Sequence, residues 1–235
     1  QVTRFPELYD AYEYASLWNE AQMNIGVAAP YSKEDLEKYK SGSDPAYPNT
    51  NWWDSATRNS APQMYHNLSV SGGAEKVKYY FSLGYTNQEG IWVTKDHNYK
   101  KYNVRSNISA EIVKGLTVGL QLSGRLDNRV KPYEQEVFKG IYLASPLKSI
   151  YANNTAPYFS NTGDRANPMQ VIDIDEVGYD KRDRREFNGS LTIDWQIPWL
   201  KGLSLKALLS YDYNNVSTKQ WFKEYYDYTY DPVND

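Results

Sequence analysis

The stretch "SVSGGAEKVKYYFSLGYTNQEG", residues 69–90, contains the pattern that decides the fold. Its second half alternates strictly between two kinds of position. One set is Val77, Tyr79, Phe81, Leu83 and Tyr85, and the set between them is Lys78, Tyr80, Ser82, Gly84 and Thr86. A two-residue period predicts a β-strand with one apolar and one polar face. The apolar face then contacts either a second sheet, as in a soluble sandwich, or lipid, as in an outer-membrane barrel.

The same alternation recurs along most of the chain. It predicts about seven consecutive strands within residues 63–235, of which the first covers 63–71 and the last covers 218–230. The polar positions of these strands carry several charged side chains. A barrel lumen solvates such charges, and so does the water around a sandwich, so the period alone leaves both folds open.

The lengths of the connections favour the barrel. Short turns are predicted at "GGAE" (72–75), "VKG" (113–115) and "PWLKG" (198–202), whereas the connections at 89–98 and 129–185 are longer. Short and long connections therefore alternate, as in outer-membrane barrels with periplasmic turns and extracellular loops. We expect an all-β chain that forms part of a large antiparallel transmembrane β-barrel, with 129–185 as a long extracellular loop.

Residues 1–62 read differently from the rest. A helix is predicted over 5–25 with Pro6 at its first position, and a second short helix follows Ser32 and ends near Gly42. Because this region precedes a strand that heads into the membrane, we expect it to be an extracellular loop with short helices.

Composition excludes several classes of protein. The net charge of -3 leaves no basic footprint for nucleic acid, and the chain has no cysteine and only two histidines. We therefore expect no metal and no cofactor. No stretch approaches the roughly 18 apolar residues of a membrane-spanning helix. The 23 Tyr and 7 Trp suit membrane girdles, sugar-binding surfaces or protein interfaces, and composition does not choose among these.

Aromatic residues in the predicted loops are candidates for contact with a ligand or a partner. Trp52 and Trp53 could stack on a sugar ring, or they could anchor their loop to the rim of the barrel. Tyr158, Phe159 and Arg165 lie in the longest loop, where we expect contacts with a substrate or with a partner that covers the barrel.

Charged residues form a second group of candidates. Arg105, Arg125 and Asp127 fall on polar positions of predicted strands, and we expect them to face the lumen. The carboxylates Asp173, Asp175 and Asp180 could bind a hard cation, but they lack the spacing of a known calcium loop.

Catalysis is not expected. Two carboxylate pairs, Glu134 with Glu136 and Asp173 with Asp175, resemble the acid pairs of glycosidases only in residue type. Nothing in the sequence fixes the separation that glycosidase chemistry needs.

Three segments resemble one family. "RFPELYDAYEYASLWNEA" (4–21), "YPNTNWWD" (47–54) and "APQMYHNLSVSGGAEKVKYYFSLGYTNQEGI" (61–91) are similar to the SusC/RagA family of TonB-dependent outer-membrane transporters of Bacteroidetes. The resemblance identifies the chain as an internal piece from the early part of the barrel. Residues 1–4 lack the features of a signal peptide, which fits this view.

The resemblance implies nutrient uptake across the bacterial outer membrane, as in polysaccharide utilisation. It implies a plugged barrel of roughly 22 strands, a SusD-like surface lipoprotein as a lid, and energy from TonB through a plug and TonB box that this chain does not contain. The implied substrate is a glycan or a peptide. The alternative is a soluble, aromatic-rich β-sandwich that binds carbohydrate.

Overall fold

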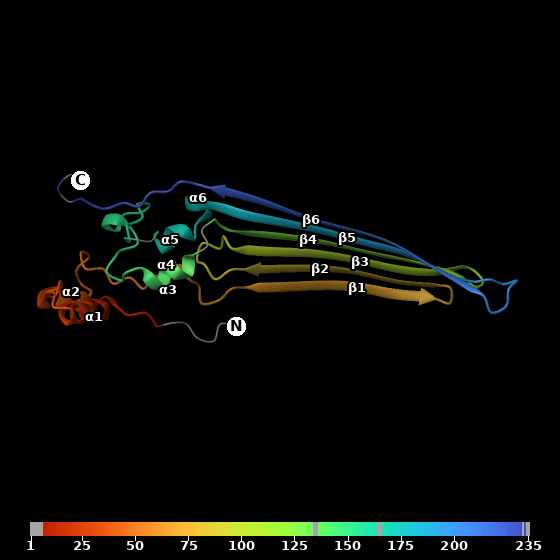
Figure 1. The fold of residues 1–235 in the computed structure, drawn as a ribbon, viewed down its shortest axis with the longest axis horizontal. Helices are drawn as coiled ribbons and strands as arrows, with labels where there is room; N and C mark the ends of the chain where they lie inside the picture. Colours follow the sequence, from red (N-terminus) through yellow and green to blue (C-terminus); the bar gives the residue numbers. More distant parts are fainter. Residues whose placement is uncertain (1–6, 134–135, 164–165, 232, 234–235) are drawn as a thin grey trace.

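The computed structural model describes residues 7–133, 136–163, 166–231 and 233. Its strands form one antiparallel sheet in the order β1-β2-β3-β4-β5-β6, so each strand pairs with the next along the chain. The strands are β1 (Gln63–Ala74), β2 (Val77–Glu89), β3 (Asn98–Val113), β4 (Leu116–Pro132), β5 (Gly178–Gln196) and β6 (Ser204–Phe222). Figure 1 shows a long single layer with short turns at one end and the helices at the other.

The register brings the apolar positions of all six strands to one side of the sheet, which we call the apolar face. Leu83 of β2 is opposite Leu68 of β1 and Val104 of β3, and this row continues through Gly124 and Phe187 on the next two strands. Leu68 and Leu209 on this face are each 70% exposed. An exposed apolar surface this extensive is rare on soluble monomers and marks contact with a partner or lipid.

The structure corrects the predicted strand count from seven to six. Residues 218–222 are the end of β6, and residues 223–231 lie outside the named strands. Asn214 and Asn215 look like a turn in the sequence. However, they pair in register with Glu186 and Arg185, so β6 continues through them.

The long connection is also shorter than predicted, because β4 runs to Pro132 and β5 begins at Gly178. The extra strand residues are mostly charged, and they pair with each other across the sheet. For example, Lys131 Nζ lies 3.7 Å from Asp180 Oδ2. A pattern based on apolar alternation does not detect strand ends of this kind.

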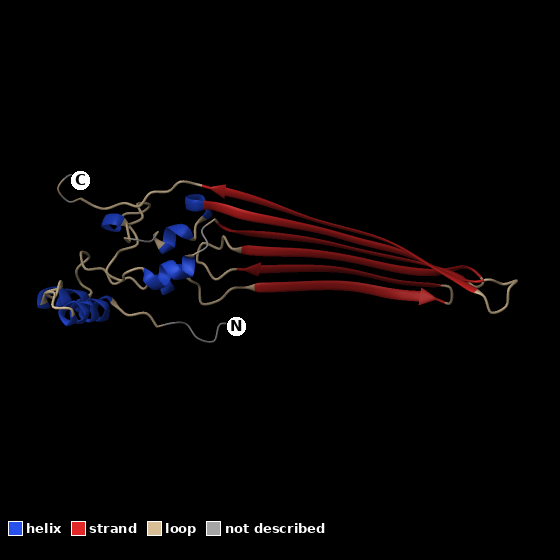
Figure 2. Cartoon of the chain, in the orientation of Figure 1, coloured by secondary structure: helices blue, strands red, loops and turns tan. Residues whose placement is uncertain are grey.

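The helices gather at the loop end of the sheet (Figure 2). They are α1 (Ala11–Asn24), α2 (Lys33–Ser41), α3 (Trp52–Ala56), α4 (Val137–Leu143), α5 (Pro168–Val171) and α6 (Ile174–Val177), with a short 3₁₀ turn η1 (Ala152–Asn154). The prediction for the second helix is confirmed, since Ser32 caps α2 and Gly42 ends it at φ +59°. The predicted start of the first helix is wrong. Asp10 and Glu13 form a capping box that starts α1 at Ala11, and Pro6 lies outside the described residues.

Apart from Pro132 at the end of β4, the buried apolar side chains of the described residues lie outside the strands. The main cluster joins α3, α4, α5 and α6, and its members are Trp52, Trp53, Ala56, Trp92, Val137, Ile141, Ala144, Val171, Ile172 and Val177. A smaller cluster of Ala11, Ala15 and Tyr39 joins α1 to α2. The sheet therefore has no apolar core of its own, while the loops do. No helix in the described part of the chain is long and apolar enough to cross a membrane.

Candidate functional site

The apolar face has the height of a membrane band. On β4 it extends from Leu116 to Leu126, which is about 33 Å of strand at the usual rise. A strand tilt near 40° reduces this to about 25 Å, the height of the apolar band on outer-membrane barrels.

Aromatic pairs mark both margins of this band. Tyr85 and Tyr102 lie on the loop side with ring centroids 5.1 Å apart, and Trp195 and Trp199 lie on the turn side at 5.5 Å. Tyr and Trp prefer such boundaries, because each has an apolar body and a polar tip. The positions match the two aromatic girdles of a membrane barrel.

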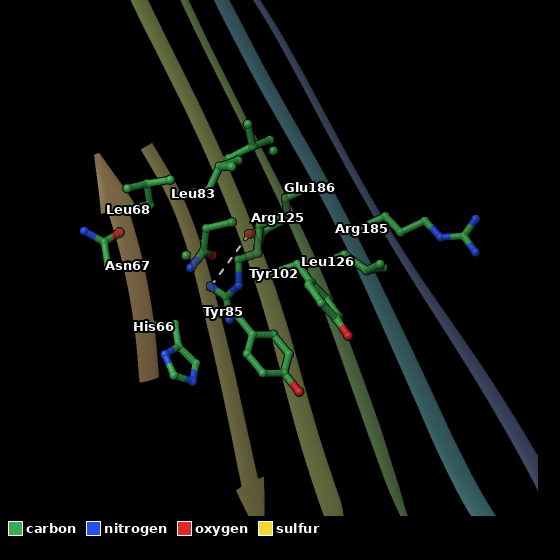
Figure 3. Close-up of a pocket in the computed structure, with 14 residues that line it drawn as sticks. His66, Asn67, Leu68, Leu83, Tyr85, Tyr102, Arg125, Leu126, Arg185 and Glu186 are labelled. Carbon is green, nitrogen blue, oxygen red and sulfur yellow. Dashed lines mark ion pairs between the residues drawn. The ribbon is translucent and has the colours of Figure 1, made fainter. Parts of the chain in front are cut away.

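The opposite side of the sheet, which we call the polar face, carries a network of ion pairs. Arg125 Nη2 lies 2.7 Å from Asp127 Oδ2. Arg125 Nη1 lies 3.7 Å from Glu186 Oε2, and Figure 3 shows this second pair. Arg184 also pairs with Glu186, and the Tyr99 hydroxyl donates to Asp127 Oδ1 at 3.2 Å. Three neighbouring strands contribute to the network, so it depends on the register of the sheet.

Cations outnumber anions where the polar face approaches the loops. The cations are Lys101, Arg125, Arg129, Lys131, Arg182 and Arg184, and the anions are Asp127, Asp180 and Glu186. The Nε atoms of Arg129 and Arg184 are buried and have no hydrogen-bond partner among the described residues. Buried polar atoms of this kind normally find a partner, so the surface is suited to receive an acceptor group from another segment or molecule.

The register places the three predicted strand candidates, Arg105, Arg125 and Asp127, on this polar face. Arg105 lies apart from the ion-pair network, beside a hollow of about 310 Å³ that Asn188 and Asp212 also line. Sequence reasoning missed Arg129, Arg182, Arg184 and Glu186, because it assigned their segments to a loop. The signal was present, since Asp180, Arg182, Arg184 and Glu186 are charged at every second position.

The aromatic loop candidates separate into buried and exposed residues. Trp52 is 1% exposed and Trp53 is also buried, and Trp52 Nε1 donates to the Ser145 carbonyl at 3.0 Å. Their indoles therefore hold the loops together and present no free ring to a sugar. Phe159 is buried against Tyr151.

Tyr158 is the exposed member of this group. It is 49% exposed and contacts Tyr228 edge to face, with ring centroids 5.1 Å apart. Together with Tyr230, these two rings line a hollow of about 510 Å³ at the loop end. Arg165 lies outside the described residues.

The acidic candidates do not converge. Asp173 caps α6 by accepting a hydrogen bond from the Asp175 amide at 2.8 Å, while Asp180 pairs with Lys131 on the sheet. Glu136 pairs with Lys139 at 3.2 Å, and Glu134 lies outside the described residues. Within the described ranges, no group of three His, Cys, Asp or Glu side chains is placed to hold a metal ion.

Comparisons with known proteins point to one class. No family model matches the chain. TonB-dependent receptor P26 of Formosa agariphila is 32% identical over 123 residues, which cover 52% of this chain and 11% of that protein. TonB-dependent receptor SusC of Bacteroides thetaiotaomicron is 27% identical over 188 residues, which cover 70% of this chain and 18% of that protein.

Solved structures agree on the fold. The RagAB peptide importer in its closed-closed state superposes with a TM-score of 0.64 at 22% identity, over 94% of this chain and 27% of that chain. Its open-open state superposes with a TM-score of 0.61 at 23% identity, over 92% and 27% of the two chains.

The six strands are therefore part of a large antiparallel transmembrane β-barrel of the bacterial outer membrane. The chain is similar to TonB-dependent receptors of the SusC/RagA type, and it spans 11% to 18% of the two curated relatives described above. The described strands form one sheet, and the described residues place no second sheet on its apolar face.

Proposed function

We propose that this chain is a wall segment of an energised outer-membrane importer. The apolar face contacts lipid, and the polar face lines the lumen. The observation that carries the proposal is the continuous, exposed apolar face of an up-and-down sheet, with aromatic girdles at both margins. The kinship with receptors that are named TonB-dependent supports it.

The loop end is extracellular in this proposal. The three short connections lie at one end of the sheet, whereas residues 7–62, 90–97, 136–163 and 166–177 gather at the other (Figure 1). Outer-membrane barrels place their short turns in the periplasm and their long loops outside the cell.

The substrate is a glycan or a peptide, and import does not involve catalysis by this chain. A related structure is titled a peptide importer, and a related receptor is SusC. The cation excess on the polar face favours carboxylate groups, either on the substrate or on a plug segment from outside this chain.

Two partners follow from the same proposal. TonB supplies the energy through a plug and TonB box elsewhere in the parent protein. A SusD-like surface lipoprotein closes the barrel at the loop end. Tyr158, Tyr228 and Tyr230, which line the 510 Å³ hollow, are candidates for contact with this lid or with the substrate.

The test uses the full-length parent protein in its native cells. Membrane fractionation is expected to find it in the outer membrane, with detergent required for release and a surface lipoprotein co-purifying with it. Deletion of the parent gene is expected to abolish growth on one member of a panel of oligosaccharides and peptides, and plasmid-borne expression is expected to restore it. Recovery in the soluble fraction would refute the proposal.

A further inference from the structure

We propose that the loop-side margin of the apolar face binds the phosphate-bearing headgroup of a membrane lipid. Four cations form this surface, which we call the basic margin: Lys100, Lys181, Arg185 and Lys219. The inference rests on the proposed function, since it requires the apolar face to contact lipid.

The register places the basic margin at the level of the headgroups. Arg185 pairs with Leu126, which pairs with Tyr102, so Arg185 lies in the last row that contains the loop-side aromatic girdle. Lys100 lies one row further out, beside Asn128.

The remaining two cations lie one row further still, where Lys181 and Lys219 pair with each other. All four side chains alternate in phase with the apolar residues of their strands, so they project from the lipid side. Cations directly outside an apolar band meet the headgroup region of a bilayer.

The margin has little compensating negative charge. On the same side, Asp183 accepts a hydrogen bond from Asn128 Nδ2 at 2.8 Å, and Glu89 pairs with Arg58 at 2.9 Å. The described residues provide no salt bridge to any of the four cations. The basic margin is therefore a net cationic surface beside an apolar one.

The pairing of Lys181 with Lys219 points to a bound anion. Like charges directly opposite each other destabilise a sheet. Here both ammonium groups lie near the Tyr179 ring, with Nζ atoms 4.4 Å and 5.8 Å from its centroid. The ring attracts both ammonium groups through cation–π interactions. A phosphate bound between the two ammonium groups would offset their mutual repulsion.

An apolar hollow adjoins the margin and fits the rest of such a lipid. It measures about 800 Å³ and is lined by Leu68, Leu83, Val104 and Leu126, with Arg185 among its lining residues. It exists partly because Gly124 puts no side chain between Val104 and Phe187 in one row of the sheet. Figure 3 shows the Arg185 side chain extending away from the other lining residues. An acyl chain in the hollow would place its headgroup near this guanidinium.

The test measures lipid retained by the full-length parent. The protein is purified in a mild detergent and examined by native mass spectrometry after addition of either phosphatidylglycerol or the uncharged lipid diacylglycerol. The variant K181Q/R185Q/K219Q removes three cations of the margin. The matched control K101Q/R129Q/R182Q removes three cations from the polar face at a similar level.

We expect the wild type and the control to retain phosphatidylglycerol in preference to diacylglycerol. The triple variant should lose about fivefold in retention for each cation removed. Its folding is checked separately, by its abundance in the outer membrane and by heat-dependent migration on gels.

Several outcomes would overturn the inference. They are equal retention by the triple variant, an equal loss in the control, and displacement of the lipid by inorganic phosphate, which would indicate a site for free phosphate. Failure of the parent to fractionate with the outer membrane would instead refute the proposed function. The two failures are therefore distinguishable.

Discussion

At the residue scale, the two faces of one strand impose opposite requirements on neighbouring positions. Phe81 is on the apolar face, and Ser82 is on the polar face beside Arg105. On β4, Leu120 and Gln121 form the same kind of pair. Two adjacent residues of a strand share the same backbone conformation and differ in the side of the sheet that their side chains face. Substituting both members of such a pair therefore tests which face contacts lipid.

We expect F81R and L120R to destabilise the folded barrel by about 2–4 kcal/mol each, because a charged side chain near the middle of the bilayer is poorly solvated. The matched controls S82R and Q121R should change stability much less, since their side chains face the lumen. The measurement is urea unfolding of the parent in lipid vesicles, followed by tryptophan fluorescence. If each control is as damaging as its neighbour, the apolar face does not contact lipid.

A second prediction concerns the carboxylate of Asp35 in α2. Hydrogen bonds from the Ser32 hydroxyl, at 2.6 Å, and from the Tyr47 hydroxyl, at 2.7 Å, lower the pKa of Asp35 to about 2. A lowered carboxyl pKa stabilises the fold above the unfolded pKa of about 3.9. That contribution is lost as the pH falls through about 2.

Pepsin, which is active in this pH range, provides the measurement. The α1–α2 unit should resist cleavage in the wild type until the pH approaches 2. The variant S32A should become sensitive at a higher pH, because it loses the strongest hydrogen bond to the carboxylate. S41A is the control, since the Ser41 hydroxyl bonds the Lys38 carbonyl at the other end of α2. Identical pH midpoints for S32A and S41A would contradict this account.

At the element scale, the loops have a buried apolar cluster of their own. Trp52 connects α3 to the segment after α4 through the Ser145 carbonyl, and Thr50 hydrogen-bonds the Lys148 carbonyl at 2.6 Å. Residues that precede β1 therefore contact the connection between β4 and β5, although the two segments are far apart in the sequence. Among the described residues, no buried member of this apolar cluster comes from a strand.

We therefore expect W52A to unfold the loop layer without unfolding the sheet. Truncation of a buried aromatic side chain typically costs about 3–5 kcal/mol. Trypsin should then cleave within residues 133–177 of the intact parent, while the strands stay protected. W199A is the control, because Trp199 is 71% exposed at the turn end. Simultaneous loss of sheet protection in W52A would show that the two layers fold as one.

How well the sequence predicted each element depended on the physical signal that the element carries. The central parts of the strands were predictable, because the alternation from Val77 to Tyr85 reflects the different surroundings of the two faces of the sheet. The strand ends were not, since Lys131 and Asp180 pair through charge and have no apolar period. The burial of Trp52 was also beyond sequence reasoning, as an aromatic residue in a loop suits a core and a binding site equally well.

At the scale of the whole molecule, both faces and both ends of the sheet have distinct roles. The chain provides a continuous wall with a lipid side and a cationic polar side, but β1 and β6 each have one unpaired edge within the described residues. Open edges and an exposed apolar face favour aggregation in water. Residues 7–231 expressed alone should therefore be insoluble without detergent, as a sedimentation assay would show. A soluble monomer would contradict the barrel assignment.

The last prediction concerns the orientation of the sheet in the membrane, that is, which of its ends lies outside the cell. This chain has no cysteine, so single substitutions can report the two ends once any cysteine elsewhere in the parent has been replaced. Glu37 on α2 is exposed at the loop end, and Lys201 is exposed in the turn between β5 and β6. A membrane-impermeant maleimide added to intact cells should label E37C and leave K201C unlabelled until the cells are lysed. The reverse pattern would place the short turns outside the cell and move the proposed lid surface and the basic margin to the periplasmic side.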